Sequence, residues 1–192
     1  MRLFVGVELD DAQRARCAQA AFALQTQLAG LRRLNVRWIP DDNLHITLWF
    51  LGELEAEPAE RVLEALRTSW IIEPFSLAIA GAGAFPSSGP PRIFWFGVSE
   101  GADPLAQMYQ DLAARFGPLG HGAERRAYHP HVTVGRVKDA DRVASRKARG
   151  VLRDFVVNAG RRRVTTVTLF RSRLSPSGAR YEALLRVPLK GC

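Results

Sequence analysis

The chain has 192 residues, of which 47% are hydrophobic and 24% are charged. This length suits one compact domain, or two small lobes sharing a core, and excludes two full-size domains. The apolar content excludes global disorder, and no apolar run reaches the roughly 18 residues that a membrane-spanning helix needs. The opening MRLFVGVELDD meets acidic residues at once, which predicts a first strand and not a signal peptide. Cys17 and Cys192, the two cysteines, lack zinc-type spacing and favour a cytoplasmic protein.

The charge balance favours a polyanionic partner. Lys and Arg total 27 against 19 Asp and Glu, which gives a formal net charge of +8, and only three of the basic residues are lysines. The planar guanidinium suits phosphate, so RNA is a candidate partner. An Ala- and Arg-rich composition can also reflect genome base composition alone, so charge does not decide the function.

Apolar periodicity predicts strands and helices that alternate irregularly along the chain. Asp10 and Asp11 begin a helix that Gly30 ends, and Asp103-Pro104 begins another that closes at Gly117. Further helices are expected from about residue 58 and over 141–149, with strands over 3–9, 35–39, 44–51, 75–80, 92–98, 131–137, 155–157, 164–170 and 181–187. Adjacent strands joined by tight turns favour an α+β fold with an antiparallel sheet over a doubly wound parallel one.

One stretch rich in Gly, Pro and Ser, residues 81–91, predicts a loop that joins two halves of the molecule. We therefore expect a single bilobal domain over 1–192, with lobes of about 1–85 and 92–192.

The two halves share one motif, a loop followed by a strand that opens with His-x-Thr. The first copy, HITL, starts at His45, and the second, HVTV, starts at His131. With seven threonines in 192 residues, two such hits among four histidines are about a 1% coincidence. Strand alternation puts His45 with Thr47, and His131 with Thr133, on one face of each strand. The apolar residues that face the other side are Ile46, Leu48, Val132 and Val134.

Two such strands brought together would direct two imidazoles and two hydroxyls into one cavity. With ordinary pKa values of about 6.5, one imidazole can accept a proton from water while the other donates a proton to a leaving oxygen. Threonine hydroxyls can donate to phosphate oxygens. This set suits a phosphodiester that reacts without a metal, such as a strained 2',3'-cyclic phosphate. The competing interpretation is that the histidines cap strands and the threonines are ordinary strand residues.

The residues that flank both motifs resemble the 2H phosphoesterases. HITLWFLGE (45–53) resembles the first signature of their RNA 2',3'-cyclic phosphodiesterase branch, also called 2'-5' RNA ligases, and PHVTVGR (130–136) resembles the second. The opening MRLFVGVEL, Arg37-Trp38, Tyr181 and Pro188-Leu189 are similar to this family as well. The resemblance covers essentially the whole chain.

The resemblance implies two similar α+β lobes with antiparallel sheets, which face each other across a central cleft that holds both motifs. It implies His45 as the proton donor to the leaving ribose oxygen and His131 as the base that activates water. Thr47 and Thr133 would bind the phosphate, and Arg136 occupies the family's arginine position. Simple alternation places Arg136 opposite His131, so it reaches the site only if the strand ends or bulges near the preceding glycine.

The expected function is hydrolysis of RNA 2',3'-cyclic phosphate ends to 2'-phosphomonoesters without a metal or cofactor, together with reversible 2'-5' RNA ligation by the same chemistry. The expected partner is RNA with such an end, or a cyclic nucleotide, with no membrane and no obligate protein partner. Two alternatives stay open. One is a 2H-type esterase on small cyclic nucleotides or ADP-ribose cyclic phosphate, and the other is a basic RNA-binding module without catalysis.

Two features suggest other kinds of site. His121, His129 and His131 could form a metal site, since His-x-His on a strand shares one face, although His131 already belongs to the second motif. Residues 81–86 lack the third glycine and the following helix of a dinucleotide-binding loop, and no Walker-type loop for ATP is present.

Two further groups of residues could contact RNA around the cleft. The run Arg161-Arg162-Arg163 could guide RNA toward it, although such a run is more often a solvated edge. Trp49 and Tyr128 adjoin the motifs and could stack on a base, although packing in the core is the commoner role of such aromatics.

Overall fold

The fold is an α+β arrangement of nine strands and four α-helices, in a computed structural model that describes residues 1–122, 127–175 and 178–191. The elements in chain order are β1 (Arg2–Glu8), α1 (Asp11–Leu28), β2 (Leu34–Trp38), the 3-10 turn η1 (Asp41–Asn43), β3 (His45–Glu53), α2 (Ala56–Arg67), β4 (Phe75–Phe85), β5 (Ile93–Glu100), α3 (Ala102–Phe116), the 3-10 turn η2 (Gly117–Leu119), β6 (His131–Ala140), α4 (Arg142–Asp154), β7 (Asn158–Val164), β8 (Thr166–Ser175) and β9 (Gly178–Pro188).

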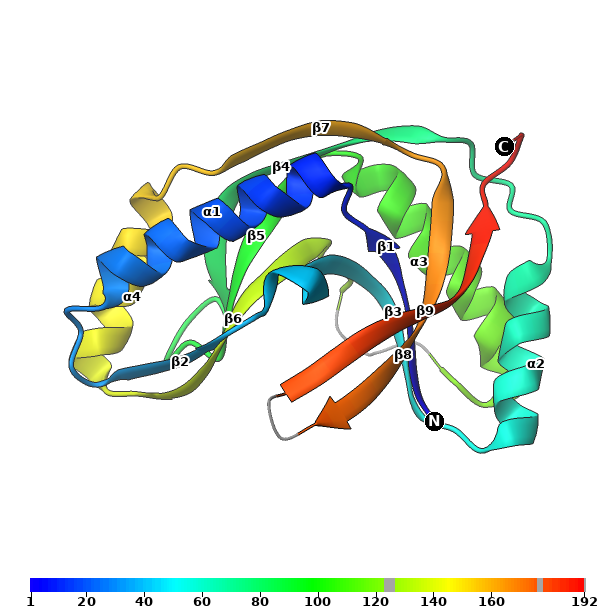
Figure 1. The fold of residues 1–192 in the computed structure, drawn as a ribbon, viewed down its shortest axis with the longest axis horizontal. Helices are drawn as coiled ribbons and strands as arrows, with labels where there is room; N and C mark the ends of the chain where they lie inside the picture. The colour runs from blue at the N-terminus through cyan, green and yellow to red at the C-terminus, as the bar shows by residue number, and fades with distance from the viewer. Residues whose placement is uncertain (123–126, 176–177, 192) are drawn as a thin grey trace.

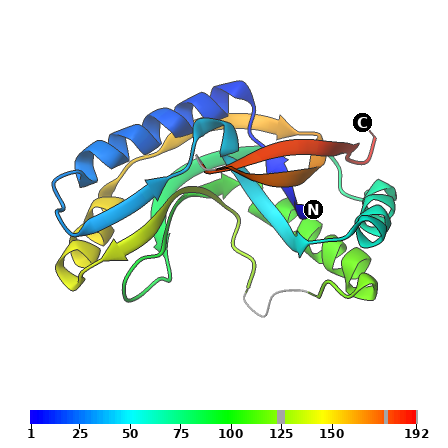
Figure 2. The ribbon, with the colours of Figure 1, turned by 60° about the horizontal axis from the view of Figure 1, so that its bottom comes forward.

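These strands belong to one antiparallel sheet, in the order β7-β4-β5-β6-β3-β1-β8-β9, with β2 paired to β6. The sheet is strongly curved, as Figures 1 and 2 show. Its two halves meet between β6 and β3, where one residue pair, Ile46 with Val132, is in register. Helices α1 and α4 pack on the half that contains β4 and β7, and α2 and α3 pack on the half that contains β3 and β9. The predicted antiparallel α+β class is confirmed.

The halves of the sheet do not follow the expected division of the chain at 81–91. Strand β4 continues to Phe85 and pairs with β5 from Ile93, so this region is a hairpin within one half. The glycines that suggested a loop serve the strand instead. Gly83 leaves room for the indole of Trp95, and Gly81 has a positive φ where the ladder shifts register. The chain crosses between halves several times, because β1, β3, β8 and β9 form one half and β2 and β4–β7 the other.

Other element boundaries also differ from expectation, most clearly around the last helix. The helix predicted over 141–149 runs on to Asp154, because Ala144, Ala148 and Leu152 continue its buried face. Residues 155–157, predicted as a strand, follow that helix, and β7 begins only at Asn158. The strand predicted over 164–170 is divided at residue 165 between β7 and β8.

The apolar sides of the two motif strands lie in the core, as predicted. Ile46, Leu48, Val132 and Val134 are at most 2% exposed. Helix α3 buries the four residues whose spacing predicted it, Leu105, Met108, Leu112 and Phe116. Among the helices of the described residues, none is long and apolar enough to span a membrane.

Candidate active site

The two His-x-Thr motifs meet where the halves of the sheet join. Because β3 and β6 are antiparallel and pair at Ile46 and Val132, His45 falls beside Thr133 and Thr47 falls beside His131. All four side chains lie on the face opposite the core and line one cavity of about 450 Å³. The four polar side chains therefore face one shared space at the junction of β3 and β6.

Each imidazole is held by a hydrogen bond between its Nδ1 and the backbone carbonyl two residues earlier in the chain. Nδ1 of His45 lies 2.7 Å from the carbonyl oxygen of Asn43, and Nδ1 of His131 lies 2.7 Å from that of His129. A carbonyl can only accept, so each Nδ1 carries a hydrogen and donates it. Each Nε2 is therefore the nitrogen left to exchange protons, and that of His45 lies 2.9 Å from the hydroxyl of Thr47.

The carbonyl that orients His45 is itself fixed. The side-chain amide of Asn43, a buried residue of η1, donates to the carbonyl oxygen of Ala179 in β9 at 2.6 Å. Three aromatic rings also enclose the His45 imidazole, with centroids 4.8 Å (Phe4), 5.2 Å (Tyr181) and 5.7 Å (Phe170) away. The imidazole consequently has little freedom to rotate.

Burial makes both imidazoles less basic in the free protein. The pKa of His45 is lowered to about 4, chiefly because the ring is removed from water, with smaller effects from the charges of His131 and Arg136. The pKa of His131 is lowered for the same main reason, and the charges of His129 and Arg136 add to the effect. Both rings are therefore mostly neutral at pH 7 when the cavity holds no anion.

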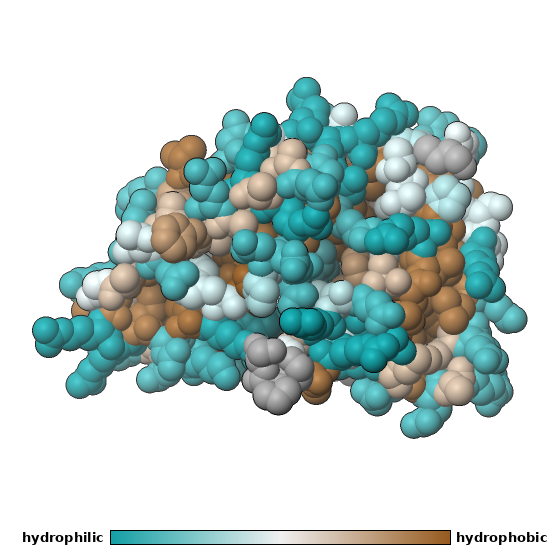
Figure 3. Space-filling view, in the orientation of Figure 1, coloured by the Kyte–Doolittle hydropathy of each residue, from teal (hydrophilic) through white to brown (hydrophobic). Residues whose placement is uncertain are grey.

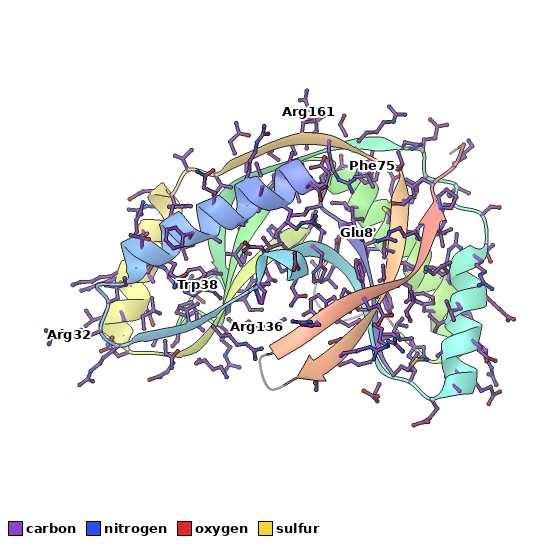
Figure 4. The ribbon with its side chains drawn as sticks, viewed as in Figure 1. Glu8, Arg32, Trp38, Phe75, Arg136 and Arg161 are labelled. Carbon is purple, nitrogen blue, oxygen red and sulfur yellow. The ribbon has the colours of Figure 1, made fainter. Side chains whose placement is uncertain are left out.

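Arg136 lines the same cavity because β6 bulges, as the sequence argument required. Thr133 pairs with Trp95 and Gly135 with Phe94, so Val134 is an extra residue in the ladder. Arg136 thereby moves to the face of Thr133, and its exposed side chain lines the cavity. Figure 4 shows it beside the end of the β8–β9 hairpin.

Strand β3, which carries the first motif and lies next to β6, has the same kind of bulge. Gly6 of β1 pairs with Thr47 and Val5 pairs with Trp49, which leaves Leu48 as the extra residue. Phe50 therefore stands in β3 where Arg136 stands in β6, five residues after the histidine, and its ring is 58% exposed. Sequence reasoning passed over Phe50, although this equal spacing could have pointed to it.

A second cavity, of about 470 Å³, adjoins the first and is mainly aromatic. The two share Thr47, Phe50, Phe85, Ile93 and His131. The second is also lined by Trp49, Tyr109, Tyr128 and His129.

The two aromatics proposed to stack on a base have structural contacts. Trp49 is 4% exposed and packs against Tyr109 and Phe116. Tyr128 stacks on Tyr109 at 4.7 Å, and its hydroxyl donates to the carbonyl oxygen of Thr47 at 3.0 Å. Phe50 is the more exposed ring at this position.

The remaining sequence hypotheses do not converge on the site. Arg161 lies on β7 at the side of the molecule away from Arg136 and pairs with Glu100 at 2.6 Å (Figure 4). Arg162 donates to the backbone carbonyl of Glu8, and the described residues that line the cavity include none of these three arginines. In the part of the chain that is described, no three His, Cys, Asp or Glu side chains gather as a metal site, and His121, His129 and His131 form no such cluster.

The fold and the paired motifs define a class. Residues 18–174 match the model of the 2'-5' RNA ligase superfamily, and the chain belongs to that family. Among curated relatives, it is 32% identical over 185 residues to an RNA 2',3'-cyclic phosphodiesterase of Archaeoglobus fulgidus, covering 96% of this chain and 98% of the relative. It is 34% identical to a protein of the same name from Methanothermobacter thermautotrophicus, with coverage of 94% and 95%.

Solved structures show the same fold over the full length. A crystal structure of a protein from Thermus thermophilus superposes with a TM-score of 0.77 at 28% identity, covering 100% of this chain and 99% of the other. Escherichia coli LigT in complex with 3'-AMP superposes with a TM-score of 0.73 at 26% identity, covering 98% of each chain.

Proposed function

We propose that the protein hydrolyses RNA 2',3'-cyclic phosphate ends to 2'-phosphomonoesters by acid–base catalysis between His45 and His131, without a metal or cofactor. Relatives that cover nearly the whole chain carry the name of this activity. The observation that carries the mechanism is the matched pair of imidazoles, each with Nδ1–H held by a carbonyl and Nε2 left for proton transfer.

In the proposed reaction, the two Nε2 atoms exchange protons with the attacking water and with the leaving oxygen. Neutral His131 accepts a proton from a water molecule, whose oxygen attacks the phosphorus. The bond from phosphorus to the ribose O3' breaks, and protonated His45 donates its Nε2 proton to that oxygen. The hydroxyls of Thr47 and Thr133 donate to the non-bridging oxygens, and Arg136 balances the charge that develops there.

The substrate itself supplies a negative charge that favours protonation of His45. His45 must be protonated to act as an acid, yet its pKa is about 4 in the empty cavity. A cyclic phosphate carries a negative charge, and an anion within a few ångströms favours the imidazolium. Substrate binding is thus expected to raise the pKa of His45 and to prepare the acid.

The second cavity suits the nucleoside that carries the cyclic phosphate. It is mainly aromatic and shares His131 and Thr47 with the first cavity, so a ribose bound there would place its phosphate between the histidines. The exposed ring of Phe50 offers a stacking surface, and base–aromatic stacking tolerates any base. The same displacement, with a 5'-hydroxyl of a second RNA in place of water and O3' again as the leaving group, would join RNA ends through a 2'-5' linkage.

The test compares three substrates at equal concentration: a short RNA with a 2',3'-cyclic phosphate end, a 2',3'-cyclic mononucleotide, and ADP-ribose cyclic phosphate. The proposal predicts turnover of the RNA with a higher kcat/KM than either small molecule. Turnover of the small molecules alone would favour an esterase for small cyclic phosphates, and RNA binding without any turnover would favour a non-catalytic RNA-binding module.

A further inference from the structure

Two arginines stand directly opposite each other on the wall of the catalytic cavity. In the ladder between β2 and β6, Arg37 pairs with Arg136, and both side chains are exposed and line the cavity. Cross-strand partners share a face of the sheet. Trp38 packs toward Phe94 on the core side, so Arg37 points the other way, into the cleft.

This pairing of like charges is costly unless an anion binds between them. Like charges directly opposite on neighbouring strands destabilise a sheet. The described residues that line the cavity include Arg2, Arg37 and Arg136 but no Asp or Glu. Figure 3 shows a strongly hydrophilic surface at the middle of this face, where Figure 4 labels Arg136. On the β8–β9 hairpin, by contrast, the neighbouring arginines have an acidic partner, because Arg171 and Arg173 share the carboxylate of Glu182.

The two guanidinium groups lie at different depths in the cavity. Arg136 is near enough to the histidines to lower the pKa of both. Arg37 is on the next strand, and its Nη2 lies against Gly178 at the start of β9, where a Cβ atom would come within 2.3 Å of it. Arg37 thus reaches across the mouth of the cavity, farther from the scissile position than Arg136.

We infer that Arg37 binds a second phosphate of the substrate, the one that links the last two nucleotides of the RNA. The inference rests on the proposed function, because the first phosphate is then the cyclic one held by the motif residues. The planar fork of arginine matches the two free oxygens of a phosphodiester. A cyclic mononucleotide lacks this linkage, so Arg37 would distinguish an RNA end from a free cyclic nucleotide.

The experiment measures binding by calorimetry with two product probes, adenosine 2'-phosphate and the dinucleotide ApA with a 2'-phosphate end. Arg37→Gln should weaken dinucleotide binding about tenfold and change mononucleotide binding by less than about twofold. Arg37→Lys, which keeps the charge, should recover part of the loss. Arg32→Gln is the matched control, because Arg32 is exposed at one end of the molecule, away from Arg136, and it should change neither affinity (Figure 4).

A second arm alters the ligand and measures its binding to wild type and to Arg37→Gln. A dinucleotide whose linkage is a neutral methylphosphonate should bind wild type about tenfold more weakly than the natural dinucleotide, and should bind Arg37→Gln no more weakly than the natural one does. This non-additivity is what a direct contact requires. Two results would overturn the inference. Arg37→Gln could weaken binding of the mononucleotide and the dinucleotide equally, or the methylphosphonate dinucleotide could bind Arg37→Gln as much more weakly than the natural one as it binds wild type.

Failure of the proposed function gives a different result. If wild type turned over no cyclic phosphate but the dinucleotide still depended on Arg37, the enzymatic proposal would fail and the second phosphate site would stand. If wild type hydrolysed the RNA end while Arg37→Gln bound both probes normally, the site would fail and the enzymatic proposal would stand.

Discussion

At the scale of single residues, the site depends on two imidazoles whose Nδ1–H groups are already occupied. The acceptors are the backbone carbonyls of Asn43 and His129, each two residues before its histidine. This arrangement sets the tautomer and the ring orientation before substrate arrives. The sequence allowed His45 and His131 to be paired through their shared motif. The sequence could not predict that these carbonyls accept the Nδ1–H hydrogen bonds, because their direction depends on how each loop leads into its strand.

Replacing either histidine tests these roles. His45→Ala or His131→Ala should lower kcat/KM for a cyclic phosphate roughly 10²–10⁴-fold each, as loss of a general acid or base does. The double variant should lose less than the product of the single losses, since the two act in one step. His121→Ala is the control and should retain near-normal turnover. A His45→Ala or His131→Ala variant with intact thermal unfolding and undiminished turnover would contradict the assignment.

The pH dependence tests the effect of the substrate charge. The proposed mechanism needs neutral His131 and protonated His45, so the pH profiles of kcat and of kcat/KM should both be bell-shaped, and each limb belongs to the coupled pair. Because the pKa of His45 is about 4 in the free protein and a bound anion raises it, the alkaline limb of kcat should lie at higher pH than that of kcat/KM. Superimposable profiles would mean that substrate binding does not prepare the acid.

At the scale of elements, a bulge in each motif strand directs the side chain five residues after the histidine into the cleft. The period of two predicted the faces of His45, Thr47, His131 and Thr133 correctly. It failed for Arg136, because a bulge depends on pairing with a neighbour and leaves no local mark beyond Gly135. The run at 81–85 was misinterpreted for a related reason. Its glycines give space to an indole from another strand, which composition alone cannot reveal.

The close packing of β1 on β3 should be sensitive to one added methyl group. A Cβ on Gly6 would lie 2.6 Å from the carbonyl oxygen of Ile46, next to His45, so β3 would have to shift. Gly6→Ala should therefore lower the free energy of unfolding by about 1–3 kcal/mol and reduce turnover as well. Gly150→Ala, within α4 and with nothing within 4 Å, should raise the free energy of unfolding by about 0.5–1 kcal/mol with unchanged turnover. Thermal unfolding and kcat measure these effects. The same change in both variants would contradict the close contact at Gly6.

At the scale of the whole molecule, the two halves of the sheet each contribute one histidine to a shared cavity. Their junction is the single register pair between β3 and β6, and the chain passes between the halves several times. Local patterns identified most elements and the paired motifs. They could not show this path, because strand order depends on contacts between residues far apart in the sequence.

The distribution of charge predicts how salt affects RNA binding. The net charge is +8, and three arginines line the catalytic cavity. If each meets one phosphate, the slope of log K against log salt should be about −2 for a single-stranded RNA and much smaller for a cyclic mononucleotide. Titrations at several salt concentrations measure both slopes. Equal slopes for the two ligands would show that the arginines make no contact beyond the terminal phosphate.

The central claim is that two histidines, acting without a metal, open an RNA 2',3'-cyclic phosphate at the O3' side. The most direct measurement incubates a short RNA carrying that end with the protein in excess chelator and determines the position of the phosphate in the product. We predict full turnover to the 2'-phosphomonoester, lost in His45→Ala and in His131→Ala. A 3'-phosphate product, or activity that chelation abolishes and added metal restores, would contradict the mechanism.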